Sequence, residues 1–377
     1  MQLGHIAGVS PDQERQARIR AGLSAAQLED QRLAHHVYSS YHAAAQHGDS
    51  ALLLDEHYRC HPVIADVVNG HCYAGQLRVL TDIRQQIPPI DPVGSAAPAP
   101  VLGWADVPNG ESARGPGGKS WQNAEEVATV QHVVNALLAK LPQGAKIGVV
   151  TPFRAQKEAL ERVLHDDRVR VGTVHAFQGG QRDIMVLSPV AAGNTPPRTT
   201  HWVSSQVNLW NVAVTRAKSQ LITVGGHAFW LERAGLPALL ARRSALLQAG
   251  ADESARASAE VGAGRADPRR EQLADRLQQY LCARGISDLE RTAVVGGHAV
   301  DLLFTEGGGN TAVLIDQGPL PGLDPARHLR LMHAQGDLLT GLPSGGRGAK
   351  AGPVKRTVRV PAWRILSGED TLDPLFD

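Results

Sequence analysis

The stretch that decides the fold is Asn208-Leu-Trp-Asn-Val-Ala-Val-Thr-Arg-Ala-Lys218, read with Gly172-Thr-Val-His-Ala-Phe-Gln-Gly-Gly-Gln-Arg-Asp183 upstream. Each lies beside a β-branched apolar run, Ile184–Val190 or Leu221–Val224, which predicts a buried parallel strand. An arginine on a short helical turn before such a strand can be aimed into a cleft at a nucleotide phosphate. The backbone amides of a glycine-rich loop can likewise face phosphate oxygens.

Strand-like and helix-like segments alternate over residues 52–226, which predicts an α/β fold with a parallel sheet. Residues 86–119 are rich in proline and glycine and predict loops around one strand. The expected strands are Leu52–Asp55, Val101–Val107, Lys146–Val150 and Val169–Val174, and the expected helices are residues 12–48, Pro62–Tyr73, Asn123–Leu141, Ala155–Leu164 and a helical region over Phe229–Leu247.

Composition excludes several classes of protein. The 377 residues include 38 basic and 37 acidic ones, so a nucleic-acid surface has to be a local patch. Three cysteines argue against a disulfide framework and fit a reducing compartment. No apolar run approaches the ~18 residues that cross a bilayer, and the first residues lack a signal-peptide pattern. We therefore expect a cytoplasmic protein without a membrane partner.

A change of composition separates a third region from the rest. Residues 249–268 are rich in alanine, glycine and serine and predict a linker, which divides the chain into domains 1–248 and 269–377. The last region predicts the order α-β-β-β-α-β, a small α/β domain. Its expected elements are a helix Glu271–Arg284, strands near Arg291–Val295, Val300–Phe304 and Ala312–Ile315, a helix Pro325–Gln335 and a strand Thr357–Val360.

Five segments in chain order resemble the motifs of the second RecA-like domain of superfamily 1 helicases, in the branch that includes the Upf-type enzymes. Met1–Ile6 resembles the end of motif III, Leu54–Pro62 motif IV, Val149–Gln156 the strand end that touches single-stranded nucleic acid, Thr173–Arg182 motif V and Asn211–Lys218 motif VI. The resemblance implies that residues 1–248 form a RecA-like domain.

The resemblance also implies which residues bind nucleotide. In such enzymes Arg59, Arg216 and Gln2 would act on phosphate, with Arg216 as the arginine finger that neutralises charge on the transferred phosphoryl group. Nucleotide contacts are implied for Gly179, Gln181 and Lys218. Relatives usually carry glutamate in place of Gln181, and its carboxylate binds the ribose; glutamine keeps an acceptor without the charge.

Contacts with single-stranded DNA or RNA are implied at Pro152, Phe153, Thr173 and His175. A proline and an aromatic ring at a strand end can stack on a base of any sequence.

The first RecA-like domain is absent from this sequence, because the pattern Gly-x-x-x-x-Gly-Lys-Ser/Thr occurs nowhere in it. We expect a truncated helicase that begins inside motif III. We expect ATP and Mg²⁺ to bind only with a complete first domain, and a separate chain that carries this domain is a candidate partner. Alone, the chain is expected to be inactive as an ATPase.

A cluster of histidines and cysteines raises the question of a zinc site. His57, Cys60, His61, His71 and Cys72 lie close in sequence, but not as the two spaced pairs of a structural zinc site. A packed cysteine and surface histidines are the favoured interpretation.

The region 269–377 resembles the restriction-endonuclease-like domains fused to some of these helicases. Asp301 and Asp316 are the candidate metal ligands, but Gly318 stands where active members carry lysine. A degenerate domain is therefore expected. Two alternatives to a motor half stay open: a non-catalytic nucleic-acid-binding module, and a metal-dependent nuclease that uses Asp301 and Asp316.

Overall fold

The computed structural model divides the chain into two units, residues 1–55 and 56–377, which are described separately. It describes residues 11–30, 34, 55–94, 99–177, 180–247, 267–319, 324–344 and 352–376. The first unit contains helices α1 (Pro11–Arg20) and α2 (Ala25–Asp30), both inside the predicted helical region. Gly22, at φ 68°, adopts the left-handed conformation just after α1 ends. Gln2, Gly179 and the predicted strand residues 52–54 lie outside the described residues.

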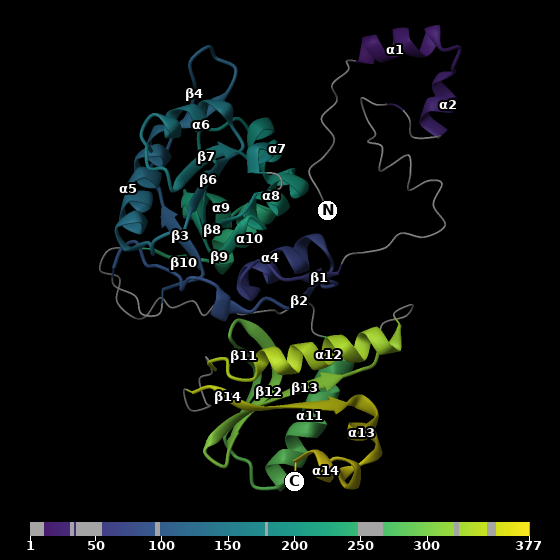
Figure 1. Cartoon of the computed structure of the whole chain (residues 1–377). Coiled ribbons are helices and arrows are strands. Elements are labelled where there is room, and N and C mark those ends of the chain that lie inside the picture. Colours follow the sequence, from purple (N-terminus) through teal and green to yellow (C-terminus); the bar gives the residue numbers. More distant parts are fainter. Residues whose placement is uncertain are drawn as a thin grey trace. The chain divides into compact units, whose positions relative to one another are not determined.

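The second unit is built on a six-stranded parallel sheet, which confirms the predicted α/β class (Figure 1). The strand order is β10-β3-β9-β8-β6-β7, and every pairing between neighbours is parallel. The strands are β3 (Leu102–Asp106), β6 (Ile147–Thr151), β7 (Val169–Thr173), β8 (Arg182–Leu187), β9 (Ala217–Gly225) and β10 (Ala245–Leu246).

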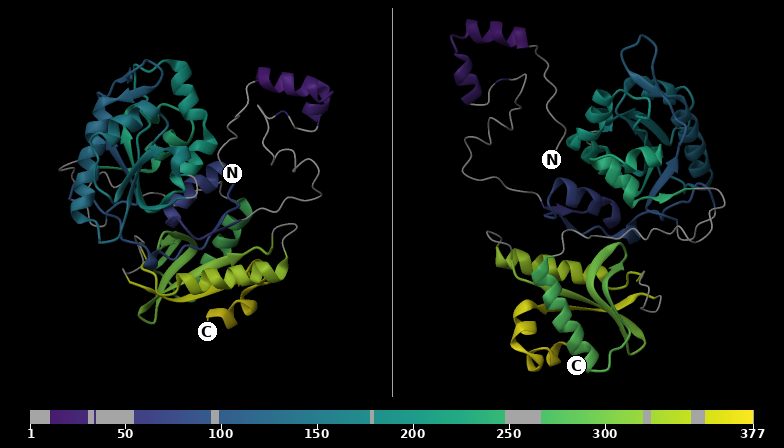
Figure 2. Two further views of the ribbon diagram at one scale, coloured as in Figure 1. Left: turned by 45° about the horizontal axis from the view of Figure 1, so that its top comes forward. Right: turned by 180° about the vertical axis from the view of Figure 1, so that it is seen from behind.

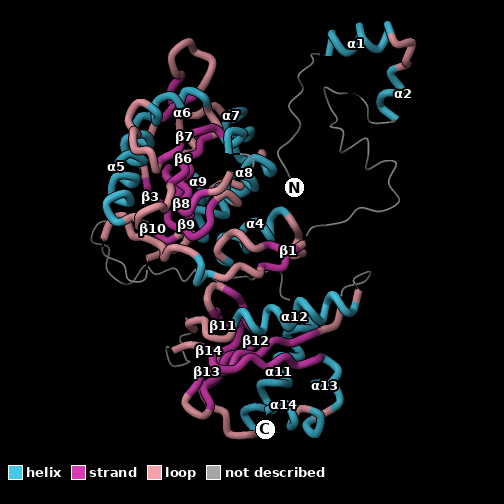
Figure 3. Tube along the Cα trace, in the orientation of Figure 1, coloured by secondary structure: helices cyan, strands magenta, loops and turns pink. Residues whose placement is uncertain are grey.

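Helices lie around this sheet, as the tube view shows (Figure 3). Those with predicted counterparts are α4 (Pro62–Cys72), α5 (Ala124–Lys140), α6 (Arg154–Glu161), α9 (His227–Leu231) and α10 (Leu236–Arg243). The sequence patterns did not predict α7 (Pro197–Ser205) or the hairpin β4 (Ser112–Arg114) and β5 (Trp121–Asn123), and the short helical turn expected before β9 corresponds to helix α8 (Val207–Val214). A short parallel pair, β1 (Glu56–His57) and β2 (Arg78–Val79), precedes them. No helix among the described residues is long and apolar enough to cross a membrane.

The segment η2 (Val174–Phe177) covers part of one face of the sheet. Phe177 is fully buried there. A Cβ atom added at Gly148 would lie 3.0 Å from the Phe177 ring, and one at Gly172 would lie 3.1 Å from it. The absence of side chains at these two positions therefore lets the ring lie directly on β6 and β7. On the other face, Val134 and Leu137 of α5 pack against Ile147 and Ile222.

A buried polar network joins the loops that follow β6 and β8. Glu126 of α5 is fully buried and accepts hydrogen bonds from Ser188 Oγ at 2.5 Å and from the amide of Val190 at 3.0 Å. Gln156 donates to Ser188 Oγ at 2.9 Å and accepts from the amide of Asn123 at 2.8 Å. Burial raises the pKa of Glu126 to about 8.

The smaller α/β domain has the predicted α-β-β-β-α-β order, in a four-stranded sheet β11-β12-β13-β14. Its helices α11 and α12 cover opposite faces: Leu277 packs with Leu302 and Val313, and Leu339 with Leu303 and Leu314 (Figure 2). The elements are α11 (Pro268–Ala283), β11 (Leu289–Val295), β12 (His298–Glu306), β13 (Gly309–Asp316), α12 (Pro325–Leu339), β14 (Val354–Pro361), α13 (Ala362–Ser367) and α14 (Asp373–Phe376).

Substitution Glu126→Gln is predicted to flatten the pH dependence of stability. Because the folded pKa lies above the ordinary value of 4.5, the contribution of Glu126 is fully present below pH 4.5 and is lost as pH rises toward 8. The loss is at most ~1.4 kcal/mol per pH unit. Urea unfolding at about pH 5.5 and about pH 8.5 measures it. An equal decline in the wild type and in Glu126→Gln would contradict the assignment.

Candidate nucleotide and nucleic-acid sites

Arg59 and Arg216 meet at Thr215. Arg59 follows strand β1, and Arg216 stands between helix α8 and strand β9. Arg59 Nη1 lies 3.4 Å from the carbonyl oxygen of Thr215, and Arg216 Nη2 lies 3.5 Å from Thr215 Oγ1. Two residues separated by more than 150 positions are thus brought to one place by the packing of the β1–α4 turn against the α8–β9 junction.

The two guanidinium groups carry charge that no carboxylate balances. Among the described residues, neither forms an ion pair with an aspartate or glutamate. Arg216 is half-buried and donates to the carbonyl oxygens of Val212 at 3.2 Å and Gly180 at 3.1 Å. Burial, and then the like charge of Arg59, lower its pKa. Two adjacent cations without a counter-charge make a site suited to a phosphate.

The turn that carries Arg59 is fixed by groups that sequence reasoning missed. Gln86 Nε2 donates to the carbonyl oxygen of Arg59 at 2.9 Å, and the His57 ring accepts from the amide of Cys60 at 3.0 Å. Burial, with the charges of Arg59 and Arg216, lowers the pKa of His57 to about 4. The ring is therefore neutral near pH 7, and Nε2 is free of a proton to accept that bond. No sequence pattern marks Gln86, because its contact spans 27 positions.

Of the other residues predicted to contact a nucleotide, only some lie near the arginine pair. Gly180, whose carbonyl oxygen accepts from Arg216, precedes Gln181, and Gln181 is exposed. Lys218 Nζ lies 3.3 Å from Asp183 Oδ1, so its charge is balanced by a neighbouring strand.

The predicted nucleic-acid residues share the carboxyl edge of the sheet. Pro152 and Phe153 follow β6, and His175 follows Thr173, the last residue of β7. Thr151 and Thr173 are register partners, so the two strand ends lie side by side. His175 is exposed, and Pro152, Phe153 and Thr173 are half-buried.

One segment connects this edge with the arginine pair. After Thr173 the chain forms η2, whose Phe177 ring lies over Gly148. The amide of Gly180 donates to the carbonyl oxygen of Phe177 at 3.0 Å, and the carbonyl oxygen of Gly180 accepts from Arg216 at 3.1 Å. Residues 178–179 of this segment lie outside the described residues. The amide of Arg182, the first residue of β8, then donates to the carbonyl oxygen of Arg216 at 3.0 Å. The strand end at Thr173 and the arginine pair are thus joined by a short segment of chain, through which a displacement of one can reach the other.

The histidines and cysteines near Arg59 have structural partners. Cys60 is fully buried, and its thiol lies 3.5 Å from the carbonyl oxygen of Thr215. Burial raises its pKa to about 12, so it is a thiol rather than a thiolate ligand. His61 Nδ1 accepts from the amide of Val63 at 3.3 Å and thereby caps α4. Among the described residues no group of three acidic, histidine or cysteine side chains is arranged to hold a metal ion.

The candidate metal ligands of the smaller domain are both paired with arginine. Asp301 receives two hydrogen bonds from Arg270, at 2.6 and 2.8 Å. Asp316 is buried and is contacted by Arg359 of β14 and, at 2.6 Å, by His328 Nε2 of α12. Arginine cannot be deprotonated in a protein, so each carboxylate already has its counter-charge.

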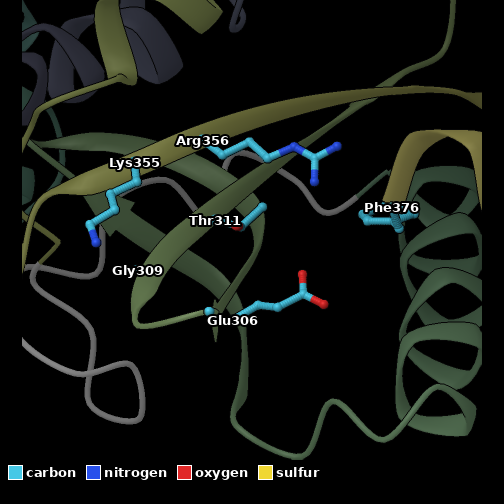
Figure 4. Close-up of a pocket in the computed structure, with 7 residues that line it drawn as sticks. Glu306, Gly309, Thr311, Lys355, Arg356 and Phe376 are labelled. Carbon is cyan, nitrogen blue, oxygen red and sulfur yellow. The ribbon is translucent and has the colours of Figure 1, made fainter.

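A pocket of about 280 Å³ at the other end of this domain is lined by Glu306, Thr311, Arg356 and Phe376 (Figure 4). Its cations have partners: Lys355 Nζ donates to the carbonyl oxygen of Gly308 at 3.1 Å, and Arg356 Nη2 to that of Leu375 at 2.7 Å. It contains none of the predicted site residues.

A parallel RecA-like sheet, with an arginine pair at Thr215 and half-buried or exposed residues at the carboxyl ends of β6 and β7, is the architecture of a superfamily 1 helicase domain. Comparison with known families agrees: the AAA domain family model matches residues 36–228, just over half of the chain. The chain belongs to this family.

Curated relatives are helicases and regulators of nonsense transcripts. The chain is 29% identical over 186 residues to the 5'-3' DNA helicase ZGRF1 of Mus musculus, which covers 47% of this chain and 9% of the relative. It is 28% identical over 193 residues to the Regulator of nonsense transcripts 1 homolog of Neurospora crassa, and this match covers 47% of this chain and 17% of that relative. It is 27% identical over 199 residues to the ATP-dependent helicase upf1 of Schizosaccharomyces pombe, and this match covers 48% of this chain and 21% of that relative. The chain thus spans a minor part of each relative.

Among solved structures, the C-terminal domain of a possible DNA helicase from Lactobacillus plantarum aligns with a TM-score of 0.27 and 14% identity, over 51% of this chain and 99% of that one.

Phosphate is predicted to stabilise the wild-type chain through the arginine pair. An anion that binds only the folded state at ten times its Kd adds ~1.4 kcal/mol, which raises the melting temperature by about 3–6 °C in a domain of this size. The double variant Arg59→Ala/Arg216→Ala should lose this response. Thermal unfolding in inorganic triphosphate, against chloride at equal ionic strength, measures it.

The matched control is Arg284→Ala, which removes an arginine of the smaller domain that pairs with Asp373 at 2.7 Å. An unchanged response in the double variant would place the anion elsewhere.

Proposed function

We propose that this chain is the C-terminal motor part of an ATP-dependent superfamily 1 DNA or RNA helicase. The observation that supports it most is the meeting of Arg59 and Arg216 at Thr215 without a counter-charge. Two unbalanced guanidinium groups, one of them half-buried, repel each other and are retained at a cost in stability. A phosphate bound between them removes that cost.

The residues present fit the phosphate end of a nucleotide. Arg216, as the arginine finger, and Arg59 would hold the terminal phosphate, and Gln181 would offer an amide oxygen to the ribose. When bound, ATP with Mg²⁺ supplies the phosphoryl group whose hydrolysis drives translocation. The cradling lysine loop and the magnesium-binding carboxylates would come from a first RecA-like domain, in the same polypeptide or in a separate chain. Gln2 would belong to the same nucleotide site.

Single-stranded nucleic acid would run along the carboxyl edge of the sheet, at Pro152, Phe153, Thr173 and His175. The segment from Thr173 to Gly180 ties this edge to Arg216. Closure of the two motor domains on ATP would therefore displace the strand-binding edge. Such a displacement would couple ATP hydrolysis to stepping along the strand.

The smaller domain is proposed to be a degenerate restriction-endonuclease-like appendage that begins after residues 249–268. Its candidate metal carboxylates, Asp301 and Asp316, are neutralised by Arg270 and Arg359. This pairing favours binding over cleavage as the role of the domain.

The chain is predicted to show negligible ATP turnover at any concentration of single-stranded DNA. The 377 residues contain no phosphate-cradling lysine loop, and an arginine finger alone stabilises nothing. Steady-state phosphate release by the purified chain is the measurement. Adding the first RecA-like domain of a related helicase is expected to give DNA-stimulated turnover that Arg216→Ala reduces by roughly 10³-fold or more.

Robust turnover by the chain alone, abolished in Arg216→Ala, would overturn the proposal that this is half of a motor. DNA binding with no ATPase in either arrangement would favour a non-catalytic binding module.

Plasmid DNA is predicted to stay intact with the chain in Mg²⁺ or Mn²⁺. The arginines occupy the positive-charge positions that a metal would take, and no lysine stands two residues after Asp316. Agarose gels of supercoiled plasmid give the result. Cleavage that disappears in both Asp301→Asn and Asp316→Asn would establish a working nuclease.

A further inference from the structure

We propose that Trp202 of helix α7 forms, with Phe153, a base-stacking site for single-stranded nucleic acid, held in place by the β4–β5 hairpin. The inference rests on the proposed function, because it concerns the strand-binding edge. It adds a residue that lies outside all five helicase-like segments and names the chemistry of its ligand.

The first observation is the ring pair itself. The centroids of the Phe153 and Trp202 rings are 5.5 Å apart, with an interplanar angle of 48°. Trp202 remains 40% exposed, whereas Trp104, Trp210 and Trp230 are buried. A tilted pair that leaves a large indole in water offers an open π-face beside Phe153. Such a face stacks on any base, and each stacked base contributes free energy without sequence preference.

The second observation is the charge around the rings. Arg154 follows Phe153 and is exposed, and Arg198 precedes Trp202 by four positions, on the same face of α7. Arg154 is balanced by Glu158 at 2.8 Å, but Arg198 has no ion-pair partner among the described residues. A free cation one helical turn from an exposed indole suits a chain of bases linked by phosphates, since each nucleotide presents both a ring and an anion.

The third observation is that the hairpin joins the two elements that carry the rings. At one end, Ser120 Oγ accepts from the amide of Ala155 at 3.1 Å, in the first turn of α6. At the other end, the amide of Ser112 donates to Asn194 Oδ1 at 2.9 Å, and Ser112 Oγ lies 2.5 Å from Thr195 Oγ1, just before α7.

The close approach depends on a glycine of the hairpin. A Cβ atom at Gly115 would lie 2.4 Å from the Cβ of Ala155, so only glycine fits there. The hairpin therefore fixes the start of α6 relative to the loop before α7, and with them the spacing of Phe153 and Trp202 (Figure 1). A preorganised pair of rings binds a strand at a lower entropic cost than two rings on independent loops.

The hairpin carries its own aromatic and basic groups. The Arg114 guanidinium stacks over the Trp121 ring at 4.1 Å, and Lys119 is exposed at the tip. Arg114 and Lys119 have no ion-pair partner in the part of the chain that the structure describes. The positive charge continues from α7 along the hairpin, which extends the strand-binding surface beyond the sheet.

The experiment is binding of the full chain to a fluorescein-labelled oligodeoxythymidylate of about 20 nucleotides, followed by anisotropy at several salt concentrations. Trp202→Ala is expected to weaken binding about fivefold or more, and Trp202→Phe to retain most of it. The salt dependence should be unchanged in Trp202→Ala and shallower by roughly 0.7 in log–log slope in Arg198→Gln. Trp363→Ala is the control, since Trp363 of α13 is 58% exposed in the smaller domain.

A direct readout uses tryptophan fluorescence, because stacking on a base quenches an indole. Quenching by unlabelled oligodeoxythymidylate should fall in Trp202→Phe and persist in Trp363→Phe. This comparison does not depend on the stability of the alanine variant, since phenylalanine keeps a ring against Phe153.

Wild-type affinity in Trp202→Ala, with undiminished quenching in Trp202→Phe, overturns the inference and leaves the proposed function standing. No binding by the wild type in low salt overturns both the inference and the proposed strand-binding edge. Loss of affinity in Trp202→Ala with an unaltered Trp363→Ala control supports the stacking site.

Discussion

The interaction that links the proposed strand-binding edge to the arginine pair is the contact of the Phe177 ring with Gly148 and Gly172. It places η2 (Val174–Phe177) against one face of the sheet. A Cβ atom at Gly148 or Gly172 would lie 3.0 or 3.1 Å from the ring, so the ring would have to shift by a few tenths of an ångström. The amide of Gly180 donates to the carbonyl oxygen of Phe177 at 3.0 Å, and the carbonyl oxygen of Gly180 accepts from Arg216 at 3.1 Å.

The arrangement at Thr215 is one that folding alone would avoid. A half-buried arginine beside a second arginine costs free energy, and in the described part of the chain no carboxylate compensates it. Elsewhere in the protein charged side chains form ion pairs, such as Lys218 with Asp183 and Arg270 with Asp301. This imbalance, in a chain that pairs other charges, is the basis of the proposed phosphate site.

The candidate sites of the two α/β domains differ in how charge is balanced. In the sheet domain, Arg59 and Arg216 lie beside Thr215, and neither is paired with a carboxylate among the described residues. In the smaller domain, Asp316 is buried between Arg359 and His328, and Asp301 receives both Arg270 donors. A metal ion at either carboxylate would first have to displace a guanidinium.

The sequence by itself determined the architecture, because β-branched runs and helical periodicity are local signals: the parallel sheet and the α-β-β-β-α-β order followed from them. It also singled out Arg59, Arg216 and Phe153, since each stands in a recognisable motif. Only the tertiary structure decided which groups meet. Gln86 donates a hydrogen bond to the carbonyl oxygen of Arg59 across 27 positions. Trp202 contacts the Phe153 ring from α7, a helix that the sequence patterns did not predict. Those contacts depend on how the elements pack, and no local pattern encodes packing between residues far apart in the chain.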